Sequence, residues 1–289
     1  MGLFSTAVIA QYGPPINIDY LIIAGGGGAG PGYNGTNSLG GGGAGGFISG
    51  SATVTPGYTN LAVSVGPGGL RTNGATIGDG EGNDGNNSIF LGLTAYGGGG
   101  GGNSKQGSGT YVGPGRPGGS GGGGGASRNS ANTQLNTAVG GAPVAGQGFT
   151  GGGSYSKGAI DGASYTWAGG SGGGAGGSAT SSSAGVNSQP GPEKAWLDGF
   201  TYAGGGGFAA SSPLYATSGS GGRCQFNTSI GTEGKNGLVK LRYSGSVALF
   251  TGGQINISGG YVYHSFNVGA QPAFAPGVNT DYTLYYTGG

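Results

Sequence analysis

Runs of glycine are the feature that most constrains how this chain can fold. The longest pure run covers residues 97–102, and similar glycine-rich runs recur at 24–30, 40–46, 118–125, 151–153, 169–177, 204–207 and 219–222. Each glycine costs roughly 0.5–1 kcal/mol more backbone entropy than alanine on ordering, which over 81 glycines sums to on the order of 40–80 kcal/mol. The runs therefore either stay disordered or are ordered by a regular set of interactions.

The remaining composition favours an ordered chain. Aromatic residues make up 10% of the sequence and charged residues only 7%, whereas disordered chains are poor in aromatics and rich in charge. The ten lysines and arginines form no basic stripe, so nucleic-acid binding is not expected. No apolar run reaches the length of a membrane span, so membrane insertion is not expected either. We predict a folded, nearly neutral protein.

Extended glycine segments have one regular way to satisfy their backbone. They can adopt the polyproline II geometry, a left-handed helix with three residues per turn. Because glycine keeps its N–H and has no Cβ, such helices can pack closely and hydrogen-bond to one another. Each bond contributes roughly 0.5–1.5 kcal/mol, which is comparable with the entropy cost of one glycine. We therefore predict packed polyglycine II helices, with flexible linkers as the alternative.

Strand-like segments flank these runs. Residues 19–24 form a buried-strand pattern directly before the first run, and residues 47–66 alternate as two strands around a Pro-Gly turn. Residues 237–243 alternate as a further strand, and residues 192–197 are compatible with one helical turn. The predicted fold class is mainly β and irregular, with packed polyglycine II helices flanked by β-strands and a small C-terminal β appendage.

Changes in composition divide the chain into three parts. Residues 1–18 read as an N-terminal lead-in or anchor, and residues 19–244 as the glycine-rich domain. Glycine thins in residues 245–289, where β-prone runs appear at 246–251, 254–258, 261–268 and 281–287. This β-structured appendage is too short to bury a large core alone, so we expect it to pack on the glycine-rich domain or on a partner.

One junction resembles a dinucleotide-binding fingerprint. Gly25, Gly27 and Gly30 follow a strand with the spacing G-x-G-x-x-G. That site requires a helix to begin at the glycines, so that its N-terminus can hold the pyrophosphate. Pro31 and the second glycine run follow instead, and they cannot form a helix. We therefore expect no nucleotide cofactor, and nothing else in the sequence indicates another cofactor.

The residues that carry most enzyme and metal chemistry are scarce. A cluster of carboxylates in residues 78–85 departs from a calcium loop, because Asp84 stands where glycine is needed and Phe90 where glutamate is needed. A solvated turn is the expectation there, with bound calcium as the alternative. His264 is the only histidine and Cys224 the only cysteine, and together they complete neither a zinc site nor a catalytic triad. We expect no catalytic residues, no metal site and no enzyme.

The order of strands and glycine runs resembles the glycine-rich domain of bacteriophage tail fibre and adhesin proteins. The matching units are residues 20–28, 40–46, 56–66, 86–90 leading to 97–102, and 237–243. The resemblance covers about residues 19–243 and implies a polyglycine II sandwich whose loops bind a host surface receptor. It implies a virion protein of the phage tail or fibre that acts outside the cell. The implied partners are a host surface glycan or outer-membrane protein, other virion proteins, and further copies in a trimer or fibre.

Two observations shape the functional expectation. Loops on a rigid frame concentrate recognition, and aromatic residues suit adaptable contact surfaces. We therefore select Tyr165, Trp167, Trp196 and Tyr202 as candidate receptor-binding residues, with a packing role as core an equal alternative for each Trp.

Residues 259–266 resemble a hairpin that commonly precedes this domain but here follows it. The alternative function is therefore a purely structural fibre or virion subunit that self-associates. Ice-binding proteins and the glycine-rich domain of certain receptor tyrosine kinases are also similar, but the lone Cys224 disfavours both.

Overall fold

The structure is a computed structural model of the 289-residue chain. It describes residues 14–31, 39–54, 61–72, 80–104, 113–128, 135–157, 166–184, 186–208, 215–224, 231–268 and 280–286. The regular secondary structure of these residues consists of β-strands, and none of them forms a helix that could span a membrane. The predicted fold class, mainly β and irregular, is confirmed.

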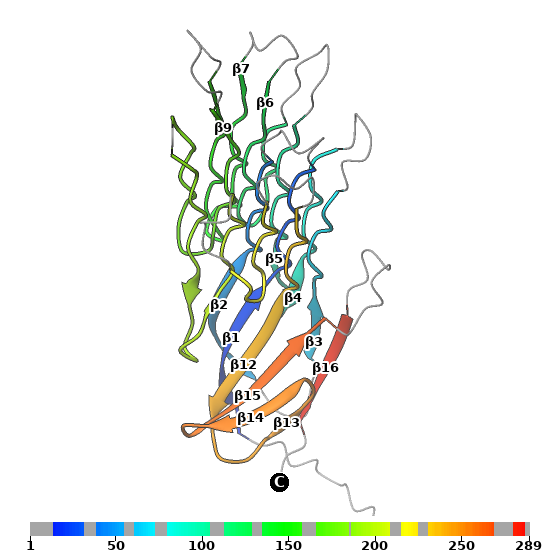
Figure 1. The fold of residues 1–289 in the computed structure, drawn as a ribbon. Helices are drawn as coiled ribbons and strands as arrows, with labels where there is room; N and C mark the ends of the chain where they lie inside the picture. Colours follow the sequence, from blue (N-terminus) through cyan, green and yellow to red (C-terminus); the bar gives the residue numbers. More distant parts are fainter. Residues whose placement is uncertain are drawn as a thin grey trace, which may run out of the picture.

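Two five-stranded sheets stand at one end of the molecule (Figure 1). The first has the order β14 (Gln254–Ser258), β15 (Tyr261–Asn267), β12 (Leu238–Ser244), β1 (Ile16–Ile23) and β2 (Phe47–Val54). The second has the order β13 (Phe250–Thr251), β16 (Thr280–Tyr286), β3 (Leu61–Val65), β4 (Ser88–Phe90) and β5 (Leu93–Ala95). All neighbouring strands are antiparallel.

Three short two-stranded ribbons complete the secondary structure. They are β6 (Ala126–Arg128) with β7 (Leu135–Thr137), β8 (Tyr155–Lys157) with β9 (Thr166–Ala168), and β10 (Lys194–Ala195) with β11 (Thr201–Tyr202). The predicted helical turn at residues 192–197 is wrong. The Trp196 amide donates to the carbonyl of Phe200 and closes a hairpin, which lets Trp196 pack against the first sheet.

The two sheets enclose one hydrophobic core, and we call this part the β-sandwich. Alternating residues of β1 and β12 point inward, and Ile22 lies opposite Val239 in the register. They meet Val63 of β3 and Phe90 of β4, and all four side chains are completely buried. The intervening β1 side chains Leu21 and Ile23 point to the opposite face, where a second apolar cluster buries them.

The strands after residue 245 complete both sheets of the β-sandwich. β15 pairs with β12 along the whole of β12, and β14 pairs with β15. β16 pairs with β3 in the opposite sheet. The division into a glycine-rich domain and an appendage stays a prediction, but in the described residues the two parts share their sheets.

Glycine-rich segments run from the β-sandwich toward the opposite end of the molecule (Figure 1). We call them the glycine lattice: residues 24–30, 40–46, 66–70, 82–86, 97–102, 113–125, 138–142, 151–153, 169–177, 204–207, 219–222 and 231–237. Hydrogen bonds between backbone groups join each segment to its neighbours. Most of these bonds run between segments, and a few, such as Gly125 to Gly113 and Gly174 to Gly177, close within one.

The hydrogen bonds of residues 24–30 repeat every three residues. One set of amides bonds to the segment 40–46: Ala24 donates to Gly46, Gly27 to Gly43 and Gly30 to Gly40. A second set bonds to the segment 82–86: Gly25 donates to Asn86 and Gly28 to Asn83. The third set bonds to the segment 231–237: Gly26 donates to Lys235 and Ala29 to Thr232. Each of the three directions thus serves one neighbouring segment. This is the period of a helix with three residues per turn. The polyglycine II assignment stays a prediction, and the period supports it.

The spacing between segments leaves no room for a side chain. A Cβ added at Gly27 would lie 2.2 Å from the carbonyl oxygen of Gly99. Alanine interrupts the runs where a segment borders an apolar cluster instead: Ala24 packs in the core of the β-sandwich, and Ala29 packs with Leu39 at the far end of the lattice. Packing therefore dictates which positions of a run are glycine.

A small apolar cluster closes the end of the lattice far from the β-sandwich. Its members are Ala29, Leu39, Ala168, Phe208 and Cys224. Burial raises the pKa of the Cys224 thiol, so this cysteine behaves as a packing residue.

His264 is buried inside the β-sandwich. Its Nδ1 lies 2.9 Å from the carbonyl oxygen of Gly252, and its Nε2 lies 3.2 Å from the hydroxyl of Tyr243. The ring also stacks on that of Tyr243 at 5.8 Å between centroids. Burial lowers the pKa of His264 below its ordinary value.

We expect the free energy of unfolding to decrease as the pH falls below about 6.5, the ordinary pKa of histidine. The fold keeps His264 neutral while the unfolded chain takes up a proton, so its contribution is complete above that value and is lost toward the lowered pKa of the folded state. Urea titrations between about pH 7.5 and about pH 5.5 measure this. The His264→Gln variant should have a lower free energy of unfolding at the upper pH, and its free energy of unfolding should change less across this pH range. An unchanged slope in the variant would contradict the assignment, since the chain has one histidine.

Candidate functional site

The β10–β11 hairpin lies against the outer face of the first sheet. Trp196 is 8% exposed, and Tyr202 is also buried. Both pack in a cluster with Leu21 of β1 and Phe47 of β2. Two of the four predicted receptor-binding residues are therefore buried, and for Trp196 this agrees with the packing alternative from the sequence. Direct receptor contact by these two residues stays a prediction.

A charged network fixes the same hairpin to the sheet. Lys240 of β12 forms an ion pair with Asp198, with 2.6 Å between Nζ and Oδ2, and the Tyr202 hydroxyl donates to the same oxygen at 2.6 Å. Burial raises the pKa of a carboxyl, but the hydrogen bonds from Lys240 and Tyr202 outweigh it and hold the pKa of Asp198 below its usual range. Burial and the adjacent carboxylate raise the pKa of Tyr202. These shifts hold Asp198 ionised and the Tyr202 hydroxyl protonated.

Three aromatic rings surround the Lys240 ammonium. Its Nζ lies 5.7 Å from the ring centroid of Phe200, 5.9 Å from that of Tyr202 and 5.8 Å from that of Tyr263. A cavity of about 170 Å³ opens beside it, lined by Asp198, Phe200, Lys240, Asn256, Ser258, Tyr263 and Ser265. Sites for drug-sized ligands measure roughly 300–1,000 Å³, so this cavity has room for a single small polar group flanked by rings.

A second cation extends this surface along the sheet. Arg242 of β12 bonds to Asp19, with 3.0 Å between Nε and Oδ2, and donates to the carbonyl of Leu197 at 2.9 Å. Its guanidinium carbon lies 4.3 Å from the ring centroid of Tyr261. The outer face of β12 and β15 therefore carries paired cations interleaved with tyrosines. Its polar groups bond to one another, which suits a preformed contact surface.

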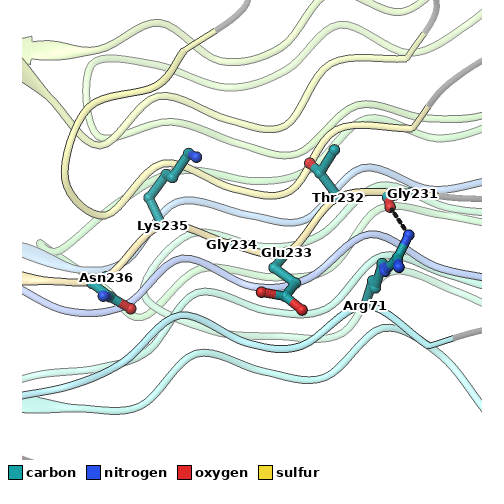
Figure 2. A pocket seen from close by; sticks show the side chains of 7 residues that line it. All are labelled: Arg71, Gly231, Thr232, Glu233, Gly234, Lys235 and Asn236. Carbon is teal, nitrogen blue, oxygen red and sulfur yellow. Dashed lines mark hydrogen bonds between the residues drawn. The ribbon is translucent and has the colours of Figure 1, made fainter. Parts of the chain in front are cut away.

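An open groove lies on the side of the lattice (Figure 2). It measures about 520 Å³ and is lined by Arg71 and residues 231–236. Arg71 donates to the carbonyl of Gly231 at 3.4 Å, and the amide oxygen of Asn236 accepts from the Gly68 amide at 3.0 Å. Figure 2 shows Lys235 and Glu233 pointing to opposite sides of this segment. Because these two charged side chains point away from each other, they do not converge on a common ligand position.

The described acidic residues of the 78–85 loop contact an arginine. Asp84 accepts from Arg116 at 2.8 Å and 2.7 Å, and also from the Gly100 amide at 2.9 Å. Glu81 lies 3.6 Å from Arg116. In the residues that the structure describes, no three histidine, cysteine or acidic side chains gather into a metal-binding group. Asp79 lies outside the described residues.

Of the other two predicted receptor-binding residues, only Trp167 has a described backbone position. Trp167 belongs to β9, and its side chain is outside the described part; Tyr165 lies outside the described residues altogether. Labels β6, β7 and β9 stand at the end of the molecule opposite β13, β14 and β15 (Figure 1). The backbone thus places Trp167 toward that end, away from Trp196 and Tyr202.

Reasoning from the sequence did not select Lys240 and Arg242. The alternation of β12 does indicate that both face the same way, opposite to Val239 and Leu241. The pattern of β12 does not indicate which carboxylate pairs with Lys240. That carboxylate, Asp198, lies 42 positions earlier in the chain, in a hairpin that the sequence did not predict. Only the fold brings the carboxylate and the three rings around Lys240.

The fold and its surfaces define a class: a β-sandwich from which a hydrogen-bonded glycine lattice extends. A family model described as a glycine-rich domain matches residues 6–244. The chain belongs to this family of glycine-rich domains. A search of curated proteins found no match.

Proposed function

We propose that this protein is a bacteriophage virion adhesin, in which the glycine lattice presents loops that bind a receptor on the host cell surface. The observation that carries the proposal is where the lattice segments end. Many of them end at the same end of the molecule, opposite the β-sandwich, which we call the lattice tip. Described residues on both sides of six intervening stretches lie there: Pro31 and Leu39, Thr72 and Gly80, Ser104 and Gly113, Arg128 and Leu135, Lys157 and Thr166, and Cys224 and Gly231.

The lattice supports this role because it is rigid. Gly30 donates to Gly40, Gly40 to Gly102, and Gly102 to Gly123, so neighbouring segments are locked at the same height. Loops held by a rigid frame lose less entropy on binding than free segments. The resemblance to phage tail fibre and adhesin proteins adds the biological setting. The proposed receptor is a host surface glycan or outer-membrane protein, and the role involves binding without catalysis.

The test is binding of the fluorescently labelled full chain to a panel of bacterial strains with different surface polysaccharides. We expect saturable binding to at least one strain, and loss of that binding when Tyr165 and Trp167 are both replaced by alanine. Phe200→Ala is the matched control, because Phe200 is an exposed aromatic residue beside the Lys240 cavity, away from the tip. Its binding should be unchanged.

Two outcomes would contradict the proposal. Binding to no strain at micromolar concentration would remove the adhesin role. Binding that survives the double replacement and is lost in Phe200→Ala would move the contact from the tip to the outer sheet face. Circular dichroism and thermal unfolding of each variant establish that its fold is intact.

A purely structural, self-associating virion subunit is the second candidate. The observation that favours it is the exposed edge strand β14. Pairing through this edge alone joins two copies, so this role also requires a second contact that gives open-ended polymers, and purified particles that contain the chain. Light scattering at increasing concentration therefore separates the two candidates.

A further inference from the structure

Strand β14 is an unprotected edge of the first sheet. It pairs with β15 on one side, and no described strand pairs with its other side. All five of its residues are exposed. Proteins usually protect such edges with lysine, proline or a bulge, because unpaired backbone groups recruit other strands. The sequence of β14, QINIS, contains no charged residue and no proline.

The core-facing side of β14 is also uncovered. Ile255 and Ile257 lie opposite His264 and Val262 in the register, and both of those residues are completely buried. Yet Ile255 is 44% exposed and Ile257 is 48% exposed. The second sheet therefore covers β15 but does not reach β14. Two isoleucines and a row of backbone groups are left open on the same strand.

The segment around β14 reads nearly the same in both directions. Residues 252–260 have the sequence GGQINISGG, which is centred on Asn256. Reversal exchanges Ile255 with Ile257 and Gln254 with Ser258. The glycine pairs at both ends have positive φ: 102° and 65° at Gly252 and Gly253, and 61° and 79° at Gly259 and Gly260. The strand is thus bounded by tight turns at both ends.

We propose that a second copy of this chain pairs with β14 in antiparallel fashion, about a two-fold axis that passes through Asn256. Such an interface uses the same surface on both copies, so a strand that reads alike in both directions is self-complementary. Each Ile255 then faces Ile257 of the partner subunit, on the apolar side of a continuous ten-stranded sheet. The neutral strand brings no like charges together.

This pairing is closed and stops at two copies. It leaves the lattice tip free, and it holds whether or not the protein is an adhesin. Asn256 and Ser258 also line the Lys240 cavity, so the two cavities would lie on one face of the joined sheet, on either side of the axis.

Single cysteine variants of the full chain test the geometry. Directly opposite residues of antiparallel strands have Cα atoms about 4.5–5.5 Å apart, which is within disulfide reach. Asn256→Cys should therefore give a covalent dimer on mild oxidation. Gln254→Cys should not, because two copies of residue 254 lie about 14 Å apart at 3.4 Å per residue. Gln254→Cys mixed with Ser258→Cys should cross-link, and the native Cys224 is buried.

Lysine variants test the association itself. We expect the parent chain to sediment as a dimer at tens of micromolar, and Ile255→Lys to sediment as a monomer. Ile89→Lys is the matched control and should stay dimeric, since Ile89 is 40% exposed on the interior strand β4. A monomeric parent would overturn the proposal. So would an assembly in which Gln254→Cys cross-links as well as Asn256→Cys.

Discussion

Gly27→Ala is expected to destabilise the protein by about 3 kcal/mol, at the upper end of typical overpacking costs. The new Cβ would lie 2.2 Å from the carbonyl oxygen of Gly99. That oxygen accepts the amide of Gly43 at 2.7 Å, so it cannot move away without stretching a lattice bond. Unlike a flexible side chain, a backbone atom held on several sides has no alternative position. Urea unfolding near neutral pH measures the change.

Gly80→Ala is the control for the same chemical change. A Cβ at Gly80 meets no atom of the described residues within 4 Å, and Gly80 is not among the described glycines with positive φ. Here alanine only reduces the freedom of the unfolded chain, so we expect no loss and up to about 0.4–1 kcal/mol of stabilisation. Equal effects at Gly27 and Gly80 would show that close packing does not determine the glycine content.

Trp196→Ala is the second large effect, with an expected loss of roughly 3 kcal/mol. Trp196 is 8% exposed and packs against Leu21 and Phe47, so its removal leaves a cavity between the hairpin and the first sheet. Denaturant unfolding followed by circular dichroism measures this loss. The same substitution separates a packing role from receptor contact, because only a packing role predicts the loss without any receptor present.

Phe200→Ala is the matched control in the same hairpin. Phe200 is 65% exposed, so its truncation leaves no cavity and costs only its contact with the Lys240 ammonium, about 0.5–1 kcal/mol. A Trp196→Ala protein as stable as Phe200→Ala would contradict the packing assignment. It would return Trp196 to the set of exposed contact residues.

Local sequence patterns predicted three of the four C-terminal strands closely, whereas the run at 246–251 forms a strand only in β13 (Phe250–Thr251). The β-prone run at 254–258 coincides with β14, and those at 261–268 and 281–287 lie within one residue of β15 and β16 at each end. Period-two alternation in a half-buried strand is a local signal, so it survives without knowledge of the partner strand. The glycine runs carried a further signal, because their backbone groups had to find partners outside the run.

The pairing of distant strands could not be predicted in this way. β1 lies between β2 and β12, whose residues are separated from each other by most of the chain, and β16 joins β3 across a similar distance. The local pattern of a strand does not indicate which other strand it pairs with. The Lys240 surface was missed for the same reason, since Asp198, Tyr202 and Tyr263 come from three different elements.

The three-residue period has a consequence for how the runs change length. A rod of pure glycine with three residues per turn is unchanged when it advances by one residue and turns by a third of a revolution. Its register is therefore set by the residues that are not glycine, such as Ala24 and Ala29 against their apolar clusters. On the predicted polyglycine II geometry, inserting one glycine beyond such an anchor would raise the following loop by about 3.1 Å and rotate it by about 120°. Single-residue insertions thus re-aim a loop in fixed steps while the bonds beneath it persist.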